Sequence, residues 1–553
     1  MRIWLAYKAH AEGAADPFTS LLPVGLISIQ GVLRDAGYDA RLLNLSRLGQ
    51  DEIASLLKAD QPAIVGFSQF THNRHETIAC ARLVKKLVPG CFVVLGGPHA
   101  THRCREILDS APEVDAIVVG EGESAMLDLV RCVAGGSAGM ERVAGIAFRR
   151  GDAVLTTPER PALVDLDTLH LNPAYLDDAV GVDPRRQLEF IVTSRGCPGR
   201  CRFCSSPHFW GKRLRFRSPA AIIAEIRTLR DRYGLIYFSI RDDTFTADRQ
   251  RVREFCRMLL DERLFILWNC QSRVNAVDPE MLGWMKRAGC ECIQFGIESG
   301  SPRMLSALGK QITPEQVKGA ARAVRQVGMN LSVYLIAGIP GEEETDLQET
   351  IKLISEIRPH DGQVSPLVYY PGTALFADAV SNGAVAADLF EREQGDACPV
   401  RHDRFPARSA RQQLAALSRS GEPSGYTRSD FARQKEMLGY CHATNLLAGE
   451  YFDRTGKQGL AEKEYREIVS WEPDNPWGWL ALGEFYGQAG RLVQARHAFE
   501  QLCRVVPNHA PAYSALGEIL RMEGSEREAL RQYRRAWELD PFDEAARGAL
   551  ASG

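Results

Sequence analysis

The sequence predicts an α/β protein in which two parallel sheets precede an all-α region. Short apolar runs alternate with amphipathic stretches up to about residue 170, and the same rhythm returns between residues 171 and 400. The tail instead repeats at a constant interval, which is typical of stacked helical hairpins. The predicted parts are residues 1–170, 171–400, a linker over 401–435 and a helical array over 436–553.

Composition indicates an ordinary globular chain of several domains. Its 553 residues exceed the roughly 150 of a typical domain severalfold, and 45% are hydrophobic against 25% charged. The net charge of −3 offers no electrostatic case for nucleic acid binding. We expect a cytoplasmic protein without a membrane span, because neither a secretory leader nor a long uncharged apolar run is present. The 14 cysteines fit a reducing compartment better than a disulfide framework.

In the first part, strands are expected at 3–7, 40–45, 63–67, 92–95 and 116–119, with helices at 26–35 and 78–87. This order predicts an open parallel sheet whose ligand lies at the carboxyl ends of the strands. The turns expected there are rich in glycine or small polar residues, and glycine lets the backbone approach a large ligand. They read Ser68-Gln69-Phe70-Thr71, Gly96-Gly97-Pro98-His99 and Gly120-Glu121-Gly122-Glu123.

Three cysteines on one short loop are the strongest chemical signal. Cys197, Cys201 and Cys204 follow a strand expected at 188–192 and supply three soft thiolates. A four-iron cluster held by only three protein sulfurs keeps one iron open for a small ligand. Zinc is the alternative, but no second Cys or His pair follows at the usual spacing. The loop therefore favours an iron–sulfur site over a zinc site.

Five more strands are expected at 235–240, 267–271, 292–296, 331–336 and 363–368, which predicts a partial (β/α)6 barrel of the TIM type. Catalytic groups of such barrels lie at the carboxyl ends of the strands. Structural roles also remain open there, as helix caps, internal ion pairs or surface charges. The candidates at these ends are Asp242, Asp243, Arg273, Glu298, Ser299 and the run Gly338-Ile339-Pro340.

The tail repeats with the tetratricopeptide period. Pro473, Pro507 and Pro541 recur at equal intervals, as do several glycines and aromatic residues, and a weaker copy precedes them. Three hairpins and a capping helix from about residue 542 are expected to stack. Such arrays usually bind peptides or proteins, although a purely structural brace is the alternative. Residues 401–435 are interpreted as a polar connector or lid.

The cysteine loop, with Phe203 between its second and third cysteines, resembles the radical S-adenosylmethionine (SAM) superfamily. The resemblance implies a [4Fe-4S] cluster on Cys197, Cys201 and Cys204 that binds and reductively cleaves SAM, with electrons from a flavodoxin- or ferredoxin-type donor. It also implies a set of SAM contacts in the barrel. These are Asp242 and Asp243 to the amino group, Arg273 to the carboxylate, Glu298 and Ser299 to the ribose, and the backbone of Gly338-Ile339-Pro340 to adenine.

Residues 1–140 resemble the cobalamin-binding domain that precedes many radical SAM barrels. Mutase-type domains ligate cobalt through a histidine in an Asp-x-His-x-x-Gly loop, but this chain reads Lys8-Ala9-His10-Ala11-Glu12-Gly13 and lacks the aspartate. We expect His10 to be a loop residue, and the loop Ser68-Gln69-Phe70-Thr71 to shield the lower side of cobalt. The other implied cobalamin contacts are Gly96, Gly97, His99, Gly120, Glu121 and Gly122.

As a whole, the chain resembles a cobalamin-dependent radical SAM methyltransferase. The implied reaction moves a methyl group from SAM via methylcobalamin to an unactivated carbon of a small molecule, a natural product or a peptide. A cyclase or rearrangement enzyme with the same cofactors is one alternative. A tetratricopeptide scaffold with a vestigial enzyme region is another. The sequence identifies neither the substrate nor the partner of the array.

Overall fold

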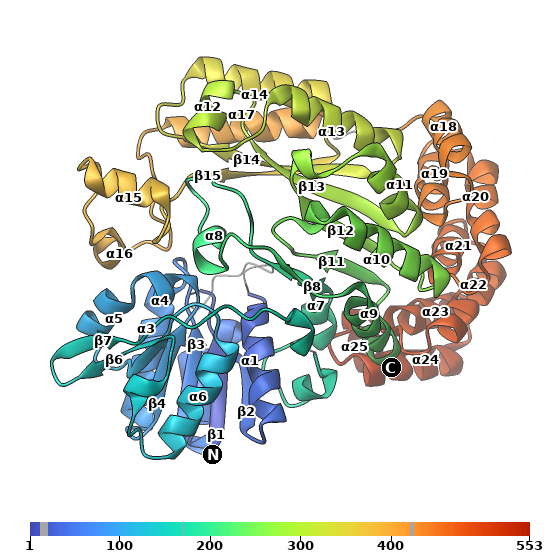
Figure 1. The fold of residues 1–553 in the computed structure, drawn as a ribbon. Coiled ribbons are helices and arrows are strands. Elements are labelled where there is room, and N and C mark those ends of the chain that lie inside the picture. The colour runs from blue at the N-terminus through green and yellow to red at the C-terminus, as the bar shows by residue number, and fades with distance from the viewer. Residues whose placement is uncertain (11–19, 170, 421–424, 553) are drawn as a thin grey trace.

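The computed structural model describes residues 1–10, 20–169, 171–420 and 425–552. Two sheet-containing bodies lie against each other, and a helical array curves along the outer side of the second body (Figure 1). The loop motif at residues 8–13 lies outside the described residues from Ala11 onward. The expected α/β architecture with an all-α tail is therefore confirmed at this level.

The N-terminal sheet has the strand order β2-β1-β3-β4-β5-β6-β7. The five parallel strands have the flavodoxin-like order, so the sheet changes direction between β1 and β3, where a ligand crevice is expected. An antiparallel hairpin of β6 and β7 extends the edge, and the sequence patterns did not reveal it. The strands are β1 (Arg2–Tyr7), β2 (Asp39–Asn44), β3 (Ile64–Ser68), β4 (Phe92–Gly96), β5 (Ala116–Val118), β6 (Ile146–Arg150) and β7 (Ala153–Thr156).

Alternate residues of β1 pack into two separate cores, because successive side chains of a strand point to opposite faces of the sheet. Ile3 and Leu5 pack with α1 and α6 on one face, whereas Trp4 and Ala6 pack with α2, α3 and α5 on the other. The short α4 lies at the carboxyl edge of the sheet. The helices are α1 (Val24–Asp35), α2 (Gln50–Asp60), α3 (Arg74–Leu87), α4 (Pro98–His102), α5 (Cys104–Ser110) and α6 (Glu123–Ala134).

The central body holds the six expected parallel strands, in the order β15-β14-β13-β12-β11-β8. β8 and β15 form the two edges of this sheet, so the barrel is partial as predicted. The strands are β8 (Phe190–Ile191), β11 (Tyr237–Ile240), β12 (Leu267–Ser272), β13 (Cys290–Glu298), β14 (Asn330–Ala337) and β15 (Asp361–Pro366). The covering helices include α9 (Pro219–Tyr233), α10 (Arg249–Asp261), α11 (Pro279–Arg287), α12 (Pro302–Ala307), α13 (Pro314–Gln326) and α14 (Glu344–Ile357).

The segment 401–435 differs from the polar connector that we expected. Residues Phe405–Ser420 form α17, which packs on α14 and on the edge strand β15. Ala416 and Leu417 are buried, and a side chain on Gly362 of β15 would lie 3.0 Å from the Leu417 methyl groups. The polar composition hid an amphipathic helix that covers the open edge of the barrel. Further short helices are α15 (Ala374–Ser381), α16 (Leu389–Arg392) and α18 (Arg428–Leu438).

The tail folds into helical hairpins with the expected regular spacing. α19 (His442–Arg454), α21 (Pro476–Gln488) and α23 (Ala510–Met522) begin at equal intervals, and α20 (Gln458–Trp471), α22 (Leu492–Val505) and α24 (Glu526–Leu539) follow with the same period. Each hairpin packs a glycine of its first helix on an aromatic ring of its second. The glycine–ring pairs are Gly449 with Tyr465, Gly483 with Phe499, and Gly517 with Tyr533. The terminal helix is α25 (Glu544–Ser552).

The turns that precede the hairpins attach the array to the barrel. Asn508 donates to the Asp231 carbonyl at 2.6 Å, and Arg263 and Asp474 lie 3.9 Å apart. Further along, Arg185 pairs with Asp540 at 3.6 Å. Asp231 lies near the end of α9 and therefore on the side of the barrel where strands begin. The array thus contacts the face opposite to the carboxyl ends of the strands (Figure 1).

Candidate functional site

The three cysteines lie on a loop between β9 (Ser194–Arg195) and β10 (Arg215–Phe216). Cys197 and Cys201 are 8% and 9% exposed. Gly196 adopts φ +95°, and a side chain there would lie 2.5 Å from the Arg213 carbonyl, so the turn into the loop requires glycine. The loop therefore presents all three sulfurs to one pocket.

The donor set suits a cluster better than a single ion. Among the described residues, no group of three or more His, Cys, Asp or Glu side chains converges closely enough to hold one metal ion. A cubane needs its three protein sulfurs spread around a larger body. Burial raises the pKa of Cys204 to about 12, so its thiol must release a proton when iron binds. All 14 cysteines are free thiols in this structure.

The cysteine pocket has a volume of about 170 Å³ and a polar wall. Arg273 Nη1 lies 3.8 Å from Cys201 Sγ, and Lys310 Nζ donates to Glu298 Oε1 at 2.6 Å, with both side chains of this pair buried. Arg273 and Glu298 were expected here. Lys310 was not, because it follows α12 in a turn with no recognisable spacing. Gln271, Gln294 and Tyr334 also line the pocket and were also missed, because such residues are common in strands.

The two neighbouring aspartates have different positions. Asp243 lines the pocket and accepts a hydrogen bond from the Ser206 hydroxyl. Asp242 departs from the expectation that it contacts SAM: it is fully buried and accepts from the Thr193 amide and hydroxyl, both at 2.6 Å, and from the Ser194 amide at 3.0 Å. Its oxygens thus fix the backbone that leads into the cysteine loop.

Two other expected SAM contacts also serve the backbone in this structure. Ser299 is 1% exposed, and its hydroxyl oxygen accepts from the Ser301 amide at 3.1 Å. In the run Gly338-Ile339-Pro340, the amides of Gly338 and Ile339 donate to Glu342 Oε2 at 2.7 and 3.0 Å. Ile339 is fully buried in an apolar cluster against which Phe203 packs. None of Ser299, Gly338, Ile339 and Pro340 lines the cysteine pocket.

A second cavity, of about 250 Å³, opens at the carboxyl edge of the N-terminal sheet. Gly97 adopts φ +97°, and a side chain there would lie 2.8 Å from the Gln69 carbonyl oxygen. A side chain on Gly66 would contact Leu5 at 3.2 Å. Glycines therefore keep side chains out of this space and leave the backbone accessible to a ligand. The expected contacts Ser68, Phe70, Gly96, Gly97, Gly120, Glu121 and Gly122 all line this cavity, with an apolar floor that includes Leu5, Val94 and Met126.

Gln69 and Thr71, the other two residues of the loop 68–71, lie behind the cavity. Gln69 is 1% exposed and Thr71 is 6% exposed. The Thr71 hydroxyl is 3.1 Å from His99 Nδ1, and burial, aided by the nearby Arg74, lowers the pKa of His99 to about 3. His99 is therefore a neutral, buried partner of the loop. His10 lies farther out, with its ring centroid 6.1 Å from that of His72.

One short helix separates the two cavities. Pro207 of α8 (Ser206–Phe209) lines the cysteine pocket, whereas Phe209 and the next residue, Trp210, line the glycine-rich cavity. Figure 1 places α8 between the barrel and the N-terminal sheet. The two cavities therefore face the same junction from opposite sides of α8.

Four buried charges join the cysteine loop to the glycine turn at 120–123. Arg195 donates to Glu123 at 2.5 Å, and Arg215 lies 2.5 Å from Glu121. The Arg195 guanidinium also lies 4.7 Å from the centre of the Trp210 ring. All four charged side chains are at most 12% exposed, so the pairs are screened little by solvent. This network links the strands that flank the cysteine loop to the turn that lines the second cavity.

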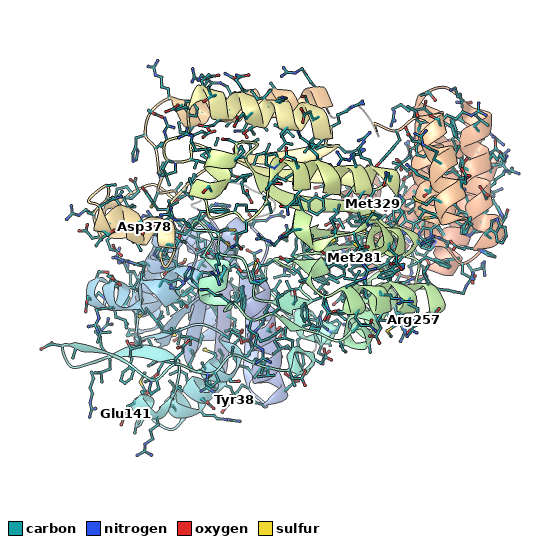
Figure 2. All side chains as sticks on the ribbon, turned by 45° about the horizontal axis from the view of Figure 1, so that its top comes forward. Tyr38, Glu141, Arg257, Met281, Met329 and Asp378 are labelled. Atoms are coloured by element: carbon teal, nitrogen blue, oxygen red, sulfur yellow. The ribbon has the colours of Figure 1, made fainter. Side chains whose placement is uncertain are left out.

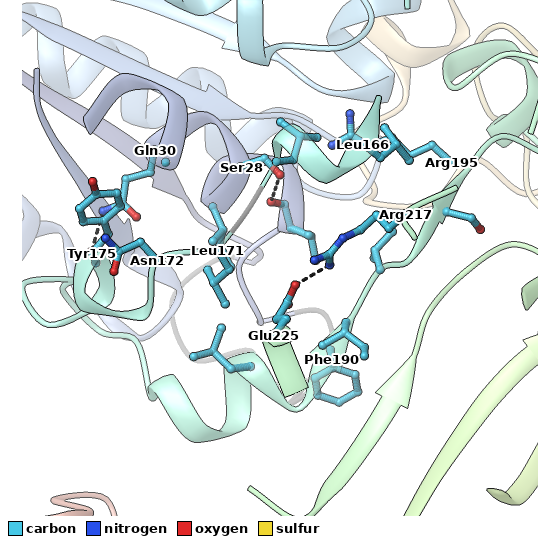
Figure 3. Close-up of a pocket in the computed structure, with 18 residues that line it drawn as sticks. Ser28, Gln30, Leu166, Leu171, Asn172, Tyr175, Phe190, Arg195, Arg217 and Glu225 are labelled. Atoms are coloured by element: carbon cyan, nitrogen blue, oxygen red, sulfur yellow. Dashed lines mark hydrogen bonds and ion pairs between the residues drawn. The ribbon is translucent and has the colours of Figure 1, made fainter. Parts of the chain in front are cut away.

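A third cavity, of about 80 Å³, lies between α1, the segment 166–175 and β8 (Figure 3). Its lining is mainly apolar, and its charged side chains are paired, as Arg217 with Glu225. Gln30 donates to the Tyr175 carbonyl at 2.8 Å and closes one end. This cavity reaches neither the cysteines nor the glycine-rich turns.

Two family profiles match the two cavity-bearing bodies. The radical SAM superfamily matches residues 191–354, and the B12 binding domain matches residues 15–130. An uncharacterized methyltransferase of Pyrococcus horikoshii is 32% identical over 366 residues, which cover 65% of this chain and 79% of that protein. The chain belongs to the cobalamin-dependent radical SAM methyltransferase family.

Two further matches are named for different reactions, one as a cyclase and one as a methyltransferase. An anaerobic magnesium-protoporphyrin IX monomethyl ester cyclase of Synechocystis is 30% identical over 65% of this chain and 73% of its own length. The solved structure of the methyltransferase TsrM from Kitasatospora setae, with cobalamin and a [4Fe-4S] cluster bound, matches with a TM-score of 0.60 and 18% identity. That match covers 84% of this chain and 99% of TsrM, and it supports the fold.

The cofactors of the enzyme are a [4Fe-4S] cluster, SAM and cobalamin. The three-cysteine loop supplies the thiolates that the cluster needs, and the glycine-lined cavity leaves the backbone accessible to cobalamin. Every helix in the described part of the chain is too short or too polar to cross a bilayer. Figure 2 draws the side chains of the described residues, with the exposed Glu141, Arg257 and Asp378 at the periphery and the buried Met281 and Met329 within the central body.

Proposed function

We propose that the enzyme transfers a methyl group from SAM to an unactivated carbon of a small molecule or natural product. The observation that carries this proposal is α8, which contributes Pro207 to the cysteine pocket and Phe209 to the glycine-lined cavity. A substrate at this junction is close to both cofactors at once, as a two-cofactor reaction requires. When bound, the cluster supplies the electron that cleaves SAM, and cobalamin relays the methyl group.

The residues of the cysteine pocket bind and orient SAM in this proposal. Arg273 pairs with the carboxylate of SAM through its planar fork, and Asp243 accepts from the amino group. Glu298 accepts from ribose hydroxyls while Lys310 keeps its buried charge compensated. Their positions around Cys201 and Cys204 support these roles.

The residues of the second cavity hold the corrin and keep water away from it. Gly96, Gly97, Gly120 and Gly122 admit the cofactor close to the backbone. The loop 68–71 lies under it and shields the lower side of cobalt. The buried pairs of Arg195 and Arg215 with Glu123 and Glu121 close the junction to solvent.

A cyclase reaction is the second candidate, and the Synechocystis relative favours it. Both reactions begin with hydrogen removal from the substrate by the radical derived from SAM. They differ in whether a carbon–carbon bond to a new methyl group forms. A cobalamin cavity beside the SAM pocket suits both reactions, so the fate of the methyl group of SAM distinguishes them.

Two partners follow from this proposal. An external flavodoxin- or ferredoxin-type donor must supply electrons, because SAM cleavage consumes one. The spacing of the tail and its glycine–ring pairs support a tetratricopeptide-type array, whose exposed side offers a surface for a protein partner. The attachment of its turns to the barrel supports a bracing role as well.

The test is anaerobic reconstitution with iron, sulfide and hydroxocobalamin, followed by turnover of candidate substrates with methyl-deuterated SAM. Mass spectrometry should find the deuterated methyl group on product, together with 5′-deoxyadenosine. Deoxyadenosine without label transfer would instead support the cyclase. Absence of both iron and corrinoid from carefully reconstituted protein would contradict the proposal.

A further inference from the structure

Arg74 is the first residue of α3 and is 4% exposed. A guanidinium has five N–H groups, and in this structure all five donate to main-chain carbonyl oxygens. One acceptor lies in the predicted lower loop and the others lie in the segment 390–396, which is far away in the sequence. The acceptors are Thr71 at 2.7 Å, Phe390 at 3.0 Å, Glu393 at 2.8 Å, Gly395 at 2.7 Å and Asp396 at 3.1 Å.

These bonds explain why a charge is retained at a buried position. Burying a cation is costly unless its hydrogen bonds are satisfied, and a full set of carbonyl acceptors meets that need. Four of these carbonyls belong to α16 and the turn after it, where helix-end carbonyls lack partners within the helix. Lysine has only three donors and could not fill the same set. Arg74 therefore ties two distant segments together in a way that only arginine can.

The loop 68–71 is held to the same segment through its side chains. The Thr71 hydroxyl contacts His99, and the His99 and Phe390 rings are nearly perpendicular with centroids 5.6 Å apart. Phe390 is 2% exposed, and Arg103 pairs with Glu391 beside it at 2.7 Å. The other end of the loop is fixed by Asn73, which accepts from the Phe70 amide at 2.7 Å. The loop therefore has one defined position, which depends on the segment 390–396.

We propose that Arg74 is a positioning residue that sets the distance of the loop 68–71 from the lower face of cobalamin by clamping it to the segment 390–396. This rests on the proposed placement of that loop below cobalt. The segment 390–396 belongs to the central body. The loop 68–71 is therefore held in its shielding position only when the N-terminal and central bodies are in contact. Arg74 contacts no reacting atom in this role.

The test compares Arg74→Gln and Arg74→Lys with a matched control, Arg149→Gln. Arg149 also donates to several main-chain carbonyls, including that of Pro112 at 2.9 Å, but all of them lie within the N-terminal body. Each full-length protein is loaded with hydroxocobalamin and reduced to the cobalt(II) form. Electron paramagnetic resonance then reports the axial environment of cobalt, and hydrogen exchange reports the loop and the segment separately.

We expect Arg74→Gln to retain cobalamin but to change the cobalt hyperfine splitting, because water reaches the lower face. Exchange should become at least tenfold faster in both 68–73 and 389–397, with a smaller change in Arg74→Lys. Arg149→Gln should alter neither the cobalt signal nor the exchange of these two segments. If Arg74→Gln does not fold, the test uses Arg74→Lys and the wild-type protein. Hydrogen exchange of the wild-type protein is then measured with and without cobalamin. Cobalamin should slow exchange in 68–73 and in 389–397 together.

An unchanged cobalt signal together with unchanged exchange in the Arg74 variants would overturn the role of Arg74 alone. The role would also be overturned if cobalamin slowed hydrogen exchange in 68–73 but not in 389–397. A wild-type protein that binds no cobalamin would overturn the proposed function along with this inference, so the two failures are distinguishable.

Discussion

The two cofactor cavities are built by opposite means. The cysteine pocket is made of side chains that project inward, including three thiols, Arg273 and the Lys310–Glu298 pair. The glycine-lined cavity is made by leaving side chains out, at positions such as Gly66 and Gly97. The first is therefore damaged by removing a group and the second by adding one. This contrast predicts separable losses of the two cofactors.

The largest expected effect is from Cys201→Ala. Losing one of three ligands should lower iron content to background and abolish 5′-deoxyadenosine formation, because the cluster has no replacement ligand at that corner. Cobalamin binding should stay at the wild-type level, since no cysteine lines the second cavity. Cys503→Ala, in the array, is the control. Full turnover by Cys201→Ala would overturn the cluster assignment.

Lys310→Met should be the next most severe change. It leaves Glu298 buried without its cation, and breaking a buried pair in this way typically costs about 3–5 kcal/mol. Chemical unfolding of the apo-protein measures this loss. The double variant Lys310→Met with Glu298→Gln should recover part of it. Equal stability of the single and double variants would show that the pair is not coupled.

Gly97→Ala tests the second cavity. Its backbone lies at φ +97°, and the new methyl group would approach the Gln69 carbonyl oxygen to 2.8 Å, so the turn must shift. Cobalamin binding, followed by its visible absorption, should weaken about tenfold or more, which corresponds to ~1.4 kcal/mol. Iron content should not change. Gly90→Ala is the control, because a side chain there meets no atom within 4 Å.

The smallest effect concerns the aspartate pair. Desolvation by the surrounding protein raises the pKa of Asp243, so the folded protein binds its proton more tightly than the unfolded chain does. The stability that this proton provides is present below the ordinary Asp pKa and is lost as pH rises through the raised value. Asp243→Asn should therefore slightly increase the melting temperature of the apo-protein at pH 7, with no gain at acid pH.

Substitution of the adjacent Asp242 should have the opposite effect on stability. Asp242→Asn should lower the melting temperature, because the amide cannot accept all the hydrogen bonds that Thr193 and Ser194 donate to the carboxylate. SAM binding should weaken in Asp243→Asn because that carboxyl lines the pocket. A stabilised Asp242→Asn protein would contradict the structural role of Asp242.

The sequence by itself determined the features that are contiguous in the chain. The loop Cys197–Cys204 carries its ligands within one short segment, the glycine turns follow recognisable strands, and the constant interval of the tail marks the helical hairpins. The six barrel strands were found for the same reason, since strand periodicity is local. Composition misled at 405–420, where polar residues on one face concealed a helix that covers the barrel edge.

Only the tertiary structure decided which residues of these features face a cofactor. Asp242 and Asp243 are adjacent in sequence but differ in their surroundings. Asp242 accepts hydrogen bonds from Thr193 and Ser194, whereas Asp243 lines the pocket. Lys310 meets Glu298, and Arg74 meets the carbonyls of 390–396, through contacts that no sequence spacing encodes. The physical reason is that hydrogen-bond and charge partners are assigned by proximity in space, which depends on packing of segments far apart in the chain.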